Sequence, residues 1–149
     1  MNETQAKKVI DALEKAEKIA DNRPALPKEL LPSYLRLIDV IYQLSKEGQV
    51  RVSDLSNTLN QTTPSITRSL TAMEKLGLIQ KNYSEKDKRV VYVSLTRKGN
   101  EVYFFYVERY YKKLAERLSK YDSNKLNTMI SVIDDLYSDL INDPINMEV

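Results

Sequence analysis

The stretch that decides the fold runs from Thr62 to Gly99 and reads TTPSITRSLTAMEKLGLIQKNYSEKDKRVVYVSLTRKG. Its first part carries one apolar stripe at helical spacing, made of Ile66, Leu70 and Met73. Pro64 suits the first helical position after a threonine cap, and Gly77 is a natural stop at the other end. The pattern predicts a helix that begins at Pro64 and ends before Gly77.

The period changes after this helix. Two β-rich runs, 78–83 and 90–95, flank six polar residues at 84–89. Apolar and aromatic runs separated by a polar stretch are typical of a β-hairpin. We therefore expect a hairpin with a charged tip.

A second short helix precedes the first. Residues 52–59 carry apolar side chains at helical spacing, with Ser53 as the expected N-cap, and the chain breaks at Asn60-Gln61. Two short helices with so tight a break form a helix-turn-helix. Together with the hairpin that follows, they predict a winged helix. The expected fold class is mainly α, and the winged helix is its α+β part.

The flanks are helical. We expect helices over 5–21, from a Ser33 cap to about Gly48, over 97–120, and over 123–142, with a proline-interrupted connector at 22–32. The last two should be long and antiparallel. Their apolar stripe exceeds what a small winged helix can cover, so we expect core shared with a second chain. The stripe comprises Val102, Phe105, Val107, Tyr110, Tyr111, Leu114, Leu118, Tyr121, Leu126, Met129, Ile130, Ile133, Leu136 and Leu140.

The net charge of +2 is unevenly distributed. Residues 1–50 balance at 0, residues 51–98 carry +5, and residues 99–149 carry −3. A basic middle between neutral and acidic flanks suits a module that binds a polyanion, although ordinary surface variation explains it equally well.

The chain of 149 residues has neither cysteine nor histidine. Disulfides, thiol nucleophiles, the usual zinc ligands and a Ser-His-Asp triad are therefore excluded. A carboxylate enzyme built on Asp134, Asp135 and Asp139 is the remaining enzymatic alternative, but these share a helix with an apolar stripe and suit a solvated acidic face. We expect no enzyme activity, no cofactor and no metal. With no apolar run near 18 residues and no signal peptide, we expect a cytoplasmic protein without a membrane partner.

Within the opening stretch, a wing signature stands at family spacing: Leu76-Gly77-Leu78-Ile79, Asp87-Lys88-Arg89 and Leu95-Thr96-Arg97-Lys98-Gly99. With Thr63-Pro64-Ser65-Ile66-Thr67-Arg68 it resembles the MarR family of bacterial and archaeal transcription regulators. The helix order matches from about residue 5 to 142. One departure is Lys81, where members usually have arginine.

This resemblance implies an intertwined homodimer that regulates transcription from double-stranded DNA. Residues 1–32 would be a dimerisation helix and connector, residues 33–96 the winged helix-turn-helix, and residues 97–149 the C-terminal dimerisation helices. A two-fold dimer requires a pseudo-palindromic operator. Repression of a nearby operon is the family's usual mode.

The helix at Pro64 would enter the major groove. Short hydroxyl side chains let a helix approach bases and phosphates closely. Arg68 suits either a bidentate contact to guanine or a phosphate contact. The expected contact residues are Thr62, Thr63, Pro64, Ser65, Thr67, Arg68 and Ser69, with Ser53 at a helix N-terminus for a phosphate.

The wing tip is the second expected contact and comprises Lys86, Asp87, Lys88 and Arg89. By family resemblance Arg89 enters a narrow minor groove, and Asp87 orients its guanidinium. Lys86 and Lys88 would hold the DNA backbone.

The family commonly responds to small phenolic or aromatic ligands between the dimerisation region and the winged helix. Tyr34, Arg36, Tyr42 and Tyr106 could line such a cleft or simply pack. Without cysteine or histidine, thiol oxidation and Cys/His zinc sensing are excluded. Two alternatives remain for the whole chain: a winged-helix module that binds proteins, and a PadR-like regulator.

Overall fold

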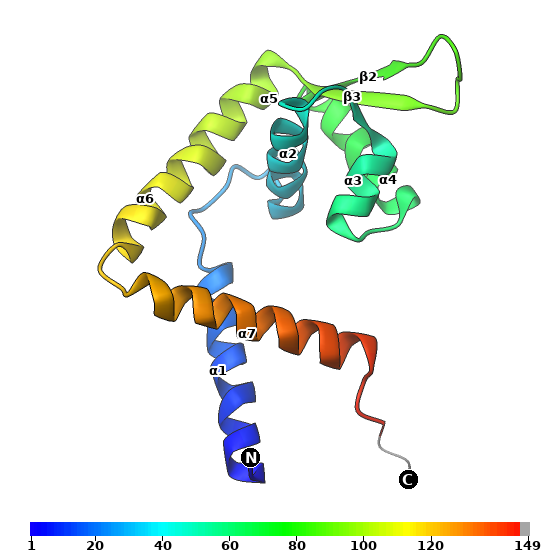
Figure 1. Ribbon diagram of the computed structural model, residues 1–149. Helices are drawn as coiled ribbons and strands as arrows, with labels where there is room; N and C mark the ends of the chain where they lie inside the picture. The colour runs from blue at the N-terminus through cyan, green and yellow to red at the C-terminus, as the bar shows by residue number, and fades with distance from the viewer. Residues whose placement is uncertain (147–149) are drawn as a thin grey trace.

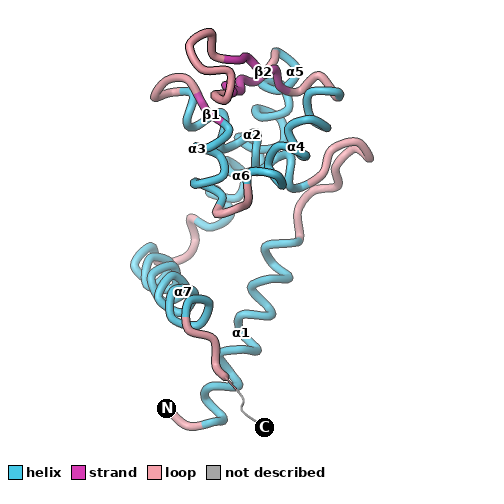
Figure 2. Tube along the Cα trace, turned by 90° about the vertical axis from the view of Figure 1, so that its right-hand side faces the viewer, coloured by secondary structure: helices cyan, strands magenta, loops and turns pink. Residues whose placement is uncertain are grey.

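A winged helix occupies one end of the molecule, and α1 and α7 lie apart from it in the computed structural model, which describes residues 1–146 (Figures 1 and 2). In chain order the elements are α1 Glu3–Asp21, α2 Pro32–Ser45, β1 Val50–Arg51, α3 Val52–Leu59, α4 Thr63–Lys75, β2 Ile79–Tyr83, β3 Val91–Leu95, α5 Arg97–Val102, the π-helical segment η1 Tyr103–Glu108, α6 Arg109–Leu118 and α7 Ser123–Asn142. The predicted fold class, a mainly α winged helix, is confirmed.

The core of the winged helix forms around α2, because this helix contacts α3, α5, η1 and the sheet. The stripe predicted on α4 is buried, as expected from its helical spacing. The fully enclosed side chains include Ile38, Ile41, Leu55, Ile66, Leu70, Met73 and Leu78. Burial of side chains of this size contributes roughly 1.5–3 kcal/mol each relative to exposure.

The sheet has three antiparallel strands in the order β1-β3-β2. The hairpin of β2 and β3 pairs Ile79 with Leu95 at its base and Tyr83 with Val91 toward its tip. The two-residue strand β1 pairs Val50 with Val93. Sequence periodicity does not predict β1, because two residues are too few to show an alternating pattern.

Two predicted helix starts are wrong. Helix α2 begins at Pro32 after Leu31, not at a Ser33 cap, because proline at the first helical position lacks the N–H that would need a cap. Helix α3 begins after Arg51, so Ser53 lies inside its first turn. There the Arg51 N–H donates to Asp54 Oδ2 at 2.8 Å.

The helix-turn-helix break and the start of α4 follow the predicted chemistry, one residue early. Asn60 adopts the left-handed conformation, with φ of 49°, and ends α3. Thr62 caps α4 by accepting from the Ser65 N–H at 3.4 Å. Helix α4 therefore starts at Thr63 and not at Pro64.

The single helix expected over 97–120 is interrupted by η1. Tyr103 and Val107 are buried, whereas Phe105, expected on the apolar stripe, is 55% exposed. A π-helical segment changes the angular position of the residues on either side, so a stripe drawn at constant α-helical spacing misassigns Phe105.

The expected antiparallel pairing of the last two helices is also wrong. After Leu118 the chain turns, and α7 runs away from α6 at a wide angle (Figure 1). Helices α1, α6 and α7 contain no fully buried residue. Apolar side chains of α7 remain exposed in a single chain: Met129, Ile130, Ile133, Tyr137, Leu140 and Ile141. Within residues 1–146, no helix has the length and apolar content required to span a bilayer.

Helix α5 packs so closely on the start of β2 that one side chain must be absent. A Cβ atom on Gly99 would overlap the backbone carbonyl oxygen of Leu78. We predict that Gly99→Ala lowers the free energy of unfolding by about 1–3 kcal/mol, because backbone on both sides leaves little room to relax. Urea unfolding measures the change. Glu101→Ala, on the exposed side of the same helix, is the control, and a Gly99→Ala variant as stable as this control would contradict the prediction.

Candidate DNA-binding surface and cleft

The exposed face of α4 presents a shallow groove of small, hydroxyl-bearing and basic side chains. Its lining residues are Thr63, Pro64, Thr67, Arg68, Thr71, Ala72 and Lys75. Arg68, the predicted contact to guanine or phosphate, stands on this face and is exposed. The buried stripe on the opposite side of α4 holds this face outward, so the groove is the part of the helix that can approach a duplex.

The hydroxyls predicted along α4 divide into two groups. Three make hydrogen bonds within the protein: Thr62 caps the helix, Thr63 Oγ1 lies 3.2 Å from Ser56 Oγ, and Thr71 Oγ1 donates to the Thr67 carbonyl at 2.9 Å. Within residues 1–146, the hydroxyls of Ser65, Thr67 and Ser69 make no hydrogen bond. Ser65 and Thr67 are exposed, whereas Ser69 is half-buried and turned away from the groove toward a separate cleft.

The groove also contains Thr71, Ala72 and Lys75, of which sequence reasoning missed Lys75. The signal was present in the spacing, because these residues follow Arg68 by three, four and seven positions and must share its face. Ser53, the predicted phosphate contact, is exposed in the first turn of α3. Asp54 beside it accepts the Arg51 N–H, so its carboxylate already has a partner.

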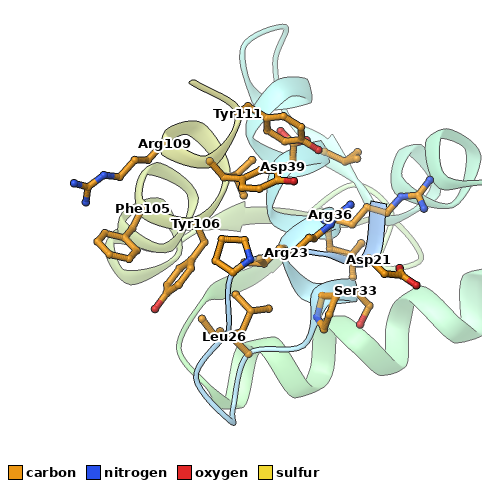
Figure 3. Close-up of a pocket in the computed structure, with 18 of the residues that line it drawn as sticks. Asp21, Arg23, Leu26, Ser33, Arg36, Asp39, Phe105, Tyr106, Arg109 and Tyr111 are labelled. Atoms are coloured by element: carbon orange, nitrogen blue, oxygen red, sulfur yellow. The ribbon is translucent and has the colours of Figure 1, made fainter. Parts of the chain in front are cut away.

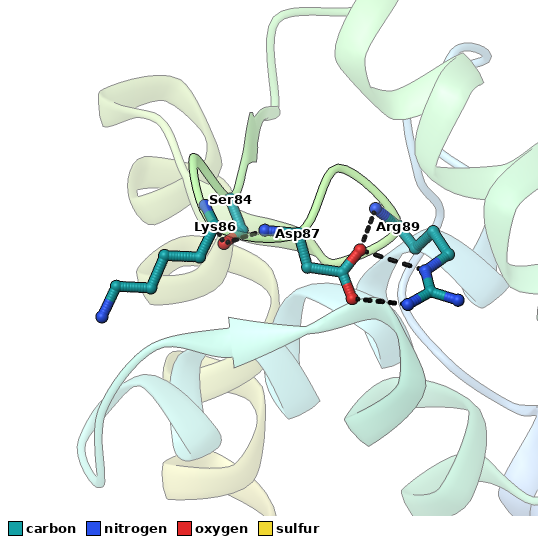
Figure 4. A network of polar contacts seen from close by, with 4 residues as sticks. All are labelled: Ser84, Lys86, Asp87 and Arg89. Carbon is teal, nitrogen blue, oxygen red and sulfur yellow. Dashed lines mark hydrogen bonds and ion pairs between the residues drawn. The ribbon is translucent and has the colours of Figure 1, made fainter.

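At the wing tip, Asp87 holds Arg89 by three hydrogen bonds (Figure 4). Asp87 Oδ1 accepts from the Arg89 backbone N–H at 2.9 Å and from Nε at 3.1 Å, and Oδ2 accepts from the terminal nitrogen at 3.2 Å. The Arg89 side chain is 92% exposed. The guanidinium is therefore oriented by one carboxylate and otherwise open to solvent.

The loop itself is ordered by local hydrogen bonds. Ser84 Oγ accepts from the backbone N–H groups of Lys86 and Asp87, each at 3.3 Å. The hydrogen bonds from the Arg89 side chain and backbone lower the pKa of Asp87 from its ordinary value. Because that pKa is lowered, the Asp87–Arg89 contact is present at neutral pH and is lost only as pH falls through the lowered pKa. Lys86 and Lys88 are exposed on the same loop.

A second hollow, a cleft of about 1210 Å³, lies between the end of α1, the connector, α2 and the η1–α6 helix (Figure 3). Four cationic side chains line it against two carboxylates: Arg23, Arg36, Arg109 and Lys113 against Asp21 and Asp39. Its apolar lining includes Leu26, Leu30, Phe105, Tyr106 and Tyr110. The cleft combines an apolar body with excess positive charge, a composition that favours an amphipathic anion.

The structure divides the four residues predicted for a ligand site. Arg36 and Tyr106 line the cleft, whereas Tyr34 and Tyr42 do not. Tyr34 packs against the core. Tyr42 stacks on Tyr103, with ring centroids 3.7 Å apart and planes at 17°. Of the two alternatives expected for Tyr34 and Tyr42, packing is therefore the one that the structure shows.

The comparisons with known proteins bear on this arrangement. The family model for the MarR family matches residues 35–91, which span α2 to the start of β3. Residues 35–91 form a MarR-family domain. The resemblance found in the wing signature is confirmed over this part of the chain.

Two curated relatives are transcriptional regulators. An uncharacterised HTH-type transcriptional regulator, YfiV of Bacillus subtilis, is 29% identical over 79 residues, 53% of this chain and 49% of the relative. The HTH-type transcriptional regulator FarR of Neisseria gonorrhoeae is 36% identical over 64 residues, 43% of this chain and 44% of FarR. The chain thus matches about half the length of these relatives.

A solved structure extends the likeness in fold to almost the whole chain. Streptococcus pneumoniae FabT, in complex with DNA, superimposes with a TM-score of 0.69 at 24% identity, covering 95% of this chain and 99% of FabT. At this identity the likeness shows the fold alone. Together with the family match, the relatives support a DNA-binding transcription regulator.

We predict that Arg89→Ala weakens DNA binding at least about tenfold and lowers the salt dependence by about one counterion, because the variant removes an exposed charge placed to meet DNA. Fluorescence anisotropy at several salt concentrations measures both. Arg97→Ala is the matched control, since Arg97 is 94% exposed and also holds one carboxylate, Glu101, at 3.1 Å. Equal affinity of the Arg89→Ala variant and the unaltered protein would rule out the wing contact.

Proposed function

We propose that the chain is a homodimeric transcriptional regulator that binds a pseudo-palindromic operator in double-stranded DNA. The observation that carries the proposal is the Asp87–Arg89 contact, which presents an oriented and almost fully exposed guanidinium at the tip of the wing. The +5 charge of residues 51–98 adds the electrostatic attraction that duplex binding requires. The MarR-family match over residues 35–91 supports this function.

The regions proposed to bind DNA and to dimerise follow the domain boundaries expected from the sequence. Residues 33–96 would read DNA, and residues 1–32 and 97–149 would dimerise; Met147–Val149 lie outside the described residues. The exposed apolar side chains of α7 support this role, since a second copy would remove them from water. A two-fold axis would then set the half-sites about one helical turn, ~10 bp, apart.

On each half-site, the exposed face of α4 would enter the major groove. Arg68 would contact guanine or a phosphate, with Ser65 and Thr67 beside it, and Lys75 would reach the backbone farther along the helix. Arg89 would enter the adjacent minor groove, where its charge meets concentrated negative potential. Lys86, Lys88 and Ser53 would contact phosphates.

The proposed regulation is repression of a nearby operon in the cytoplasm, released by a small amphipathic anion such as a phenolic or aromatic acid. The cleft beside Arg36 and Tyr106 would take the ligand, with the cationic lining facing the acid group. Such a ligand acts only if it binds the state that cannot engage DNA more tightly.

The test of DNA binding is a gel shift with the DNA upstream of the chain's own coding region, repeated at two salt concentrations, beside selection of bound sites from random DNA. We expect a palindromic consensus and affinity that falls steeply with salt. No binding to any DNA, or binding that ignores salt, would instead favour a module that binds proteins.

We predict that Ile133→Glu prevents dimer formation and abolishes operator binding, because it places a charge on the apolar face of α7. Analytical ultracentrifugation measures the oligomeric state. Asp135→Lys changes charge on the opposite side of the same helix and should leave the dimer intact. A dimer of unchanged affinity in Ile133→Glu would refute the assignment of this face to dimerisation.

A further inference from the structure

Lys81, in the middle of β2, is joined to α4 by three contacts. Its Nζ donates to Thr71 Oγ1 at 2.9 Å and forms an ion pair with Glu74 Oε2 at 3.4 Å. Its backbone N–H donates to Glu74 Oε1 at 3.3 Å. One residue of the wing thus holds two residues of the helix whose outer face is proposed to read DNA.

The burial of this lysine distinguishes it from the basic residues around it. The Lys81 side chain is only 12% exposed, whereas that of Arg89 is 92% exposed. Its ammonium already has an acceptor and a carboxylate as partners. Two of its three N–H donors are therefore engaged within the protein, although its charge counts toward the +5 of the segment.

The position of Lys81 makes its contacts consequential for the wing. Lys81 pairs with Val93 at the centre of the hairpin, three residues before Ser84 begins the ordering of the tip. Closer to the base, Thr96 and Lys98 bind the carbonyl groups of Gly77 and Leu76, just after α4. The Lys81 contacts hold α4 itself, farther along the hairpin toward Arg89.

We propose that Lys81, through Thr71 and Glu74, is a positioning residue that sets the wing relative to the recognition helix, so that α4 and Arg89 engage one half-site together. The inference rests on the proposed DNA binding for its consequence, but the geometry it claims exists in the free protein. The Thr71 hydroxyl, on the groove face, serves this contact by accepting from Lys81.

A measurement on free protein tests the geometry. Because the chain has no cysteine, Lys75→Cys and Lys88→Cys introduce unique sites for a spin-label pair on α4 and the wing. Pulsed electron paramagnetic resonance then measures the distance between the two spin labels. Labelled chains are diluted with unlabelled protein, so that the measured distance is the one within a single subunit. We expect one narrow distribution that broadens in Lys81→Met and stays narrow in Lys81→Arg. An unchanged distribution in Lys81→Met would overturn the proposal whether or not DNA binds.

A second measurement tests the consequence for binding, using DNA sites selected from the random pool. Lys81→Met should weaken binding about fivefold with an unchanged salt dependence, and most of that loss should disappear in an Arg89→Ala background, because the effect acts through the wing. A loss that lowers the salt dependence by about one counterion and adds fully to Arg89→Ala would instead assign Lys81 to a direct phosphate contact.

The Glu74→Gln variant distinguishes a direct charge effect on DNA binding from a positioning role, because the two predict opposite changes in affinity. Removing a carboxylate near DNA should strengthen binding if charge alone matters, but should weaken it if the carboxylate holds Lys81 in place. Glu74 is 43% exposed, so water can hydrate it when Lys81 is replaced, and thermal unfolding should show both variants folded. If the unaltered protein binds no selected DNA, the proposed function fails while the label distances still decide the role of Lys81.

Discussion

The junction between the end of α4, the start of β2 and the start of α5 is the constraint on which the rest of the structure depends. Thr96 Oγ1 donates to the Gly77 carbonyl at 2.6 Å, and the Thr96 N–H donates to the Leu78 carbonyl at 3.1 Å. Gly99 allows α5 to lie directly against this backbone. These contacts fix where α4 ends, where the wing begins and where α5 leaves the winged helix toward α6.

Beyond this junction, two separate sets of contacts order the wing. Lys81 ties the middle of β2 to α4, and Asp87 ties Arg89 to the loop that carries it. The first uses a lysine that is only 12% exposed and the second an arginine that is 92% exposed, so two basic residues in one hairpin have different surroundings. Burial and hydrogen-bond partners separate them, because both contribute equally to the charge count.

The sequence predicted the winged helix well, because its signals are local. The α4 stripe is buried, Asn60 breaks the chain after α3, and the polar run at 84–89 lies between two paired strands. Predictions failed where a feature depends on contacts distant in sequence. Because of the η1 segment, Phe105 does not lie on the buried stripe. Helix α7 does not pack antiparallel to α6, and Tyr42 stacks on Tyr103 instead of lining the cleft. Constant helical spacing cannot anticipate such changes.

The sequence by itself determined the chemistry that is possible: no cysteine or histidine, a basic middle, and the wing signature that resembles the MarR family. It determined the order of the elements as well, because caps, glycines and apolar periods act over a few residues. Only the tertiary structure decided which polar groups are free. Thr71 and Lys81 stand ten positions apart in the sequence, but folding brings the Lys81 ammonium within 2.9 Å of the Thr71 hydroxyl, which accepts its hydrogen bond.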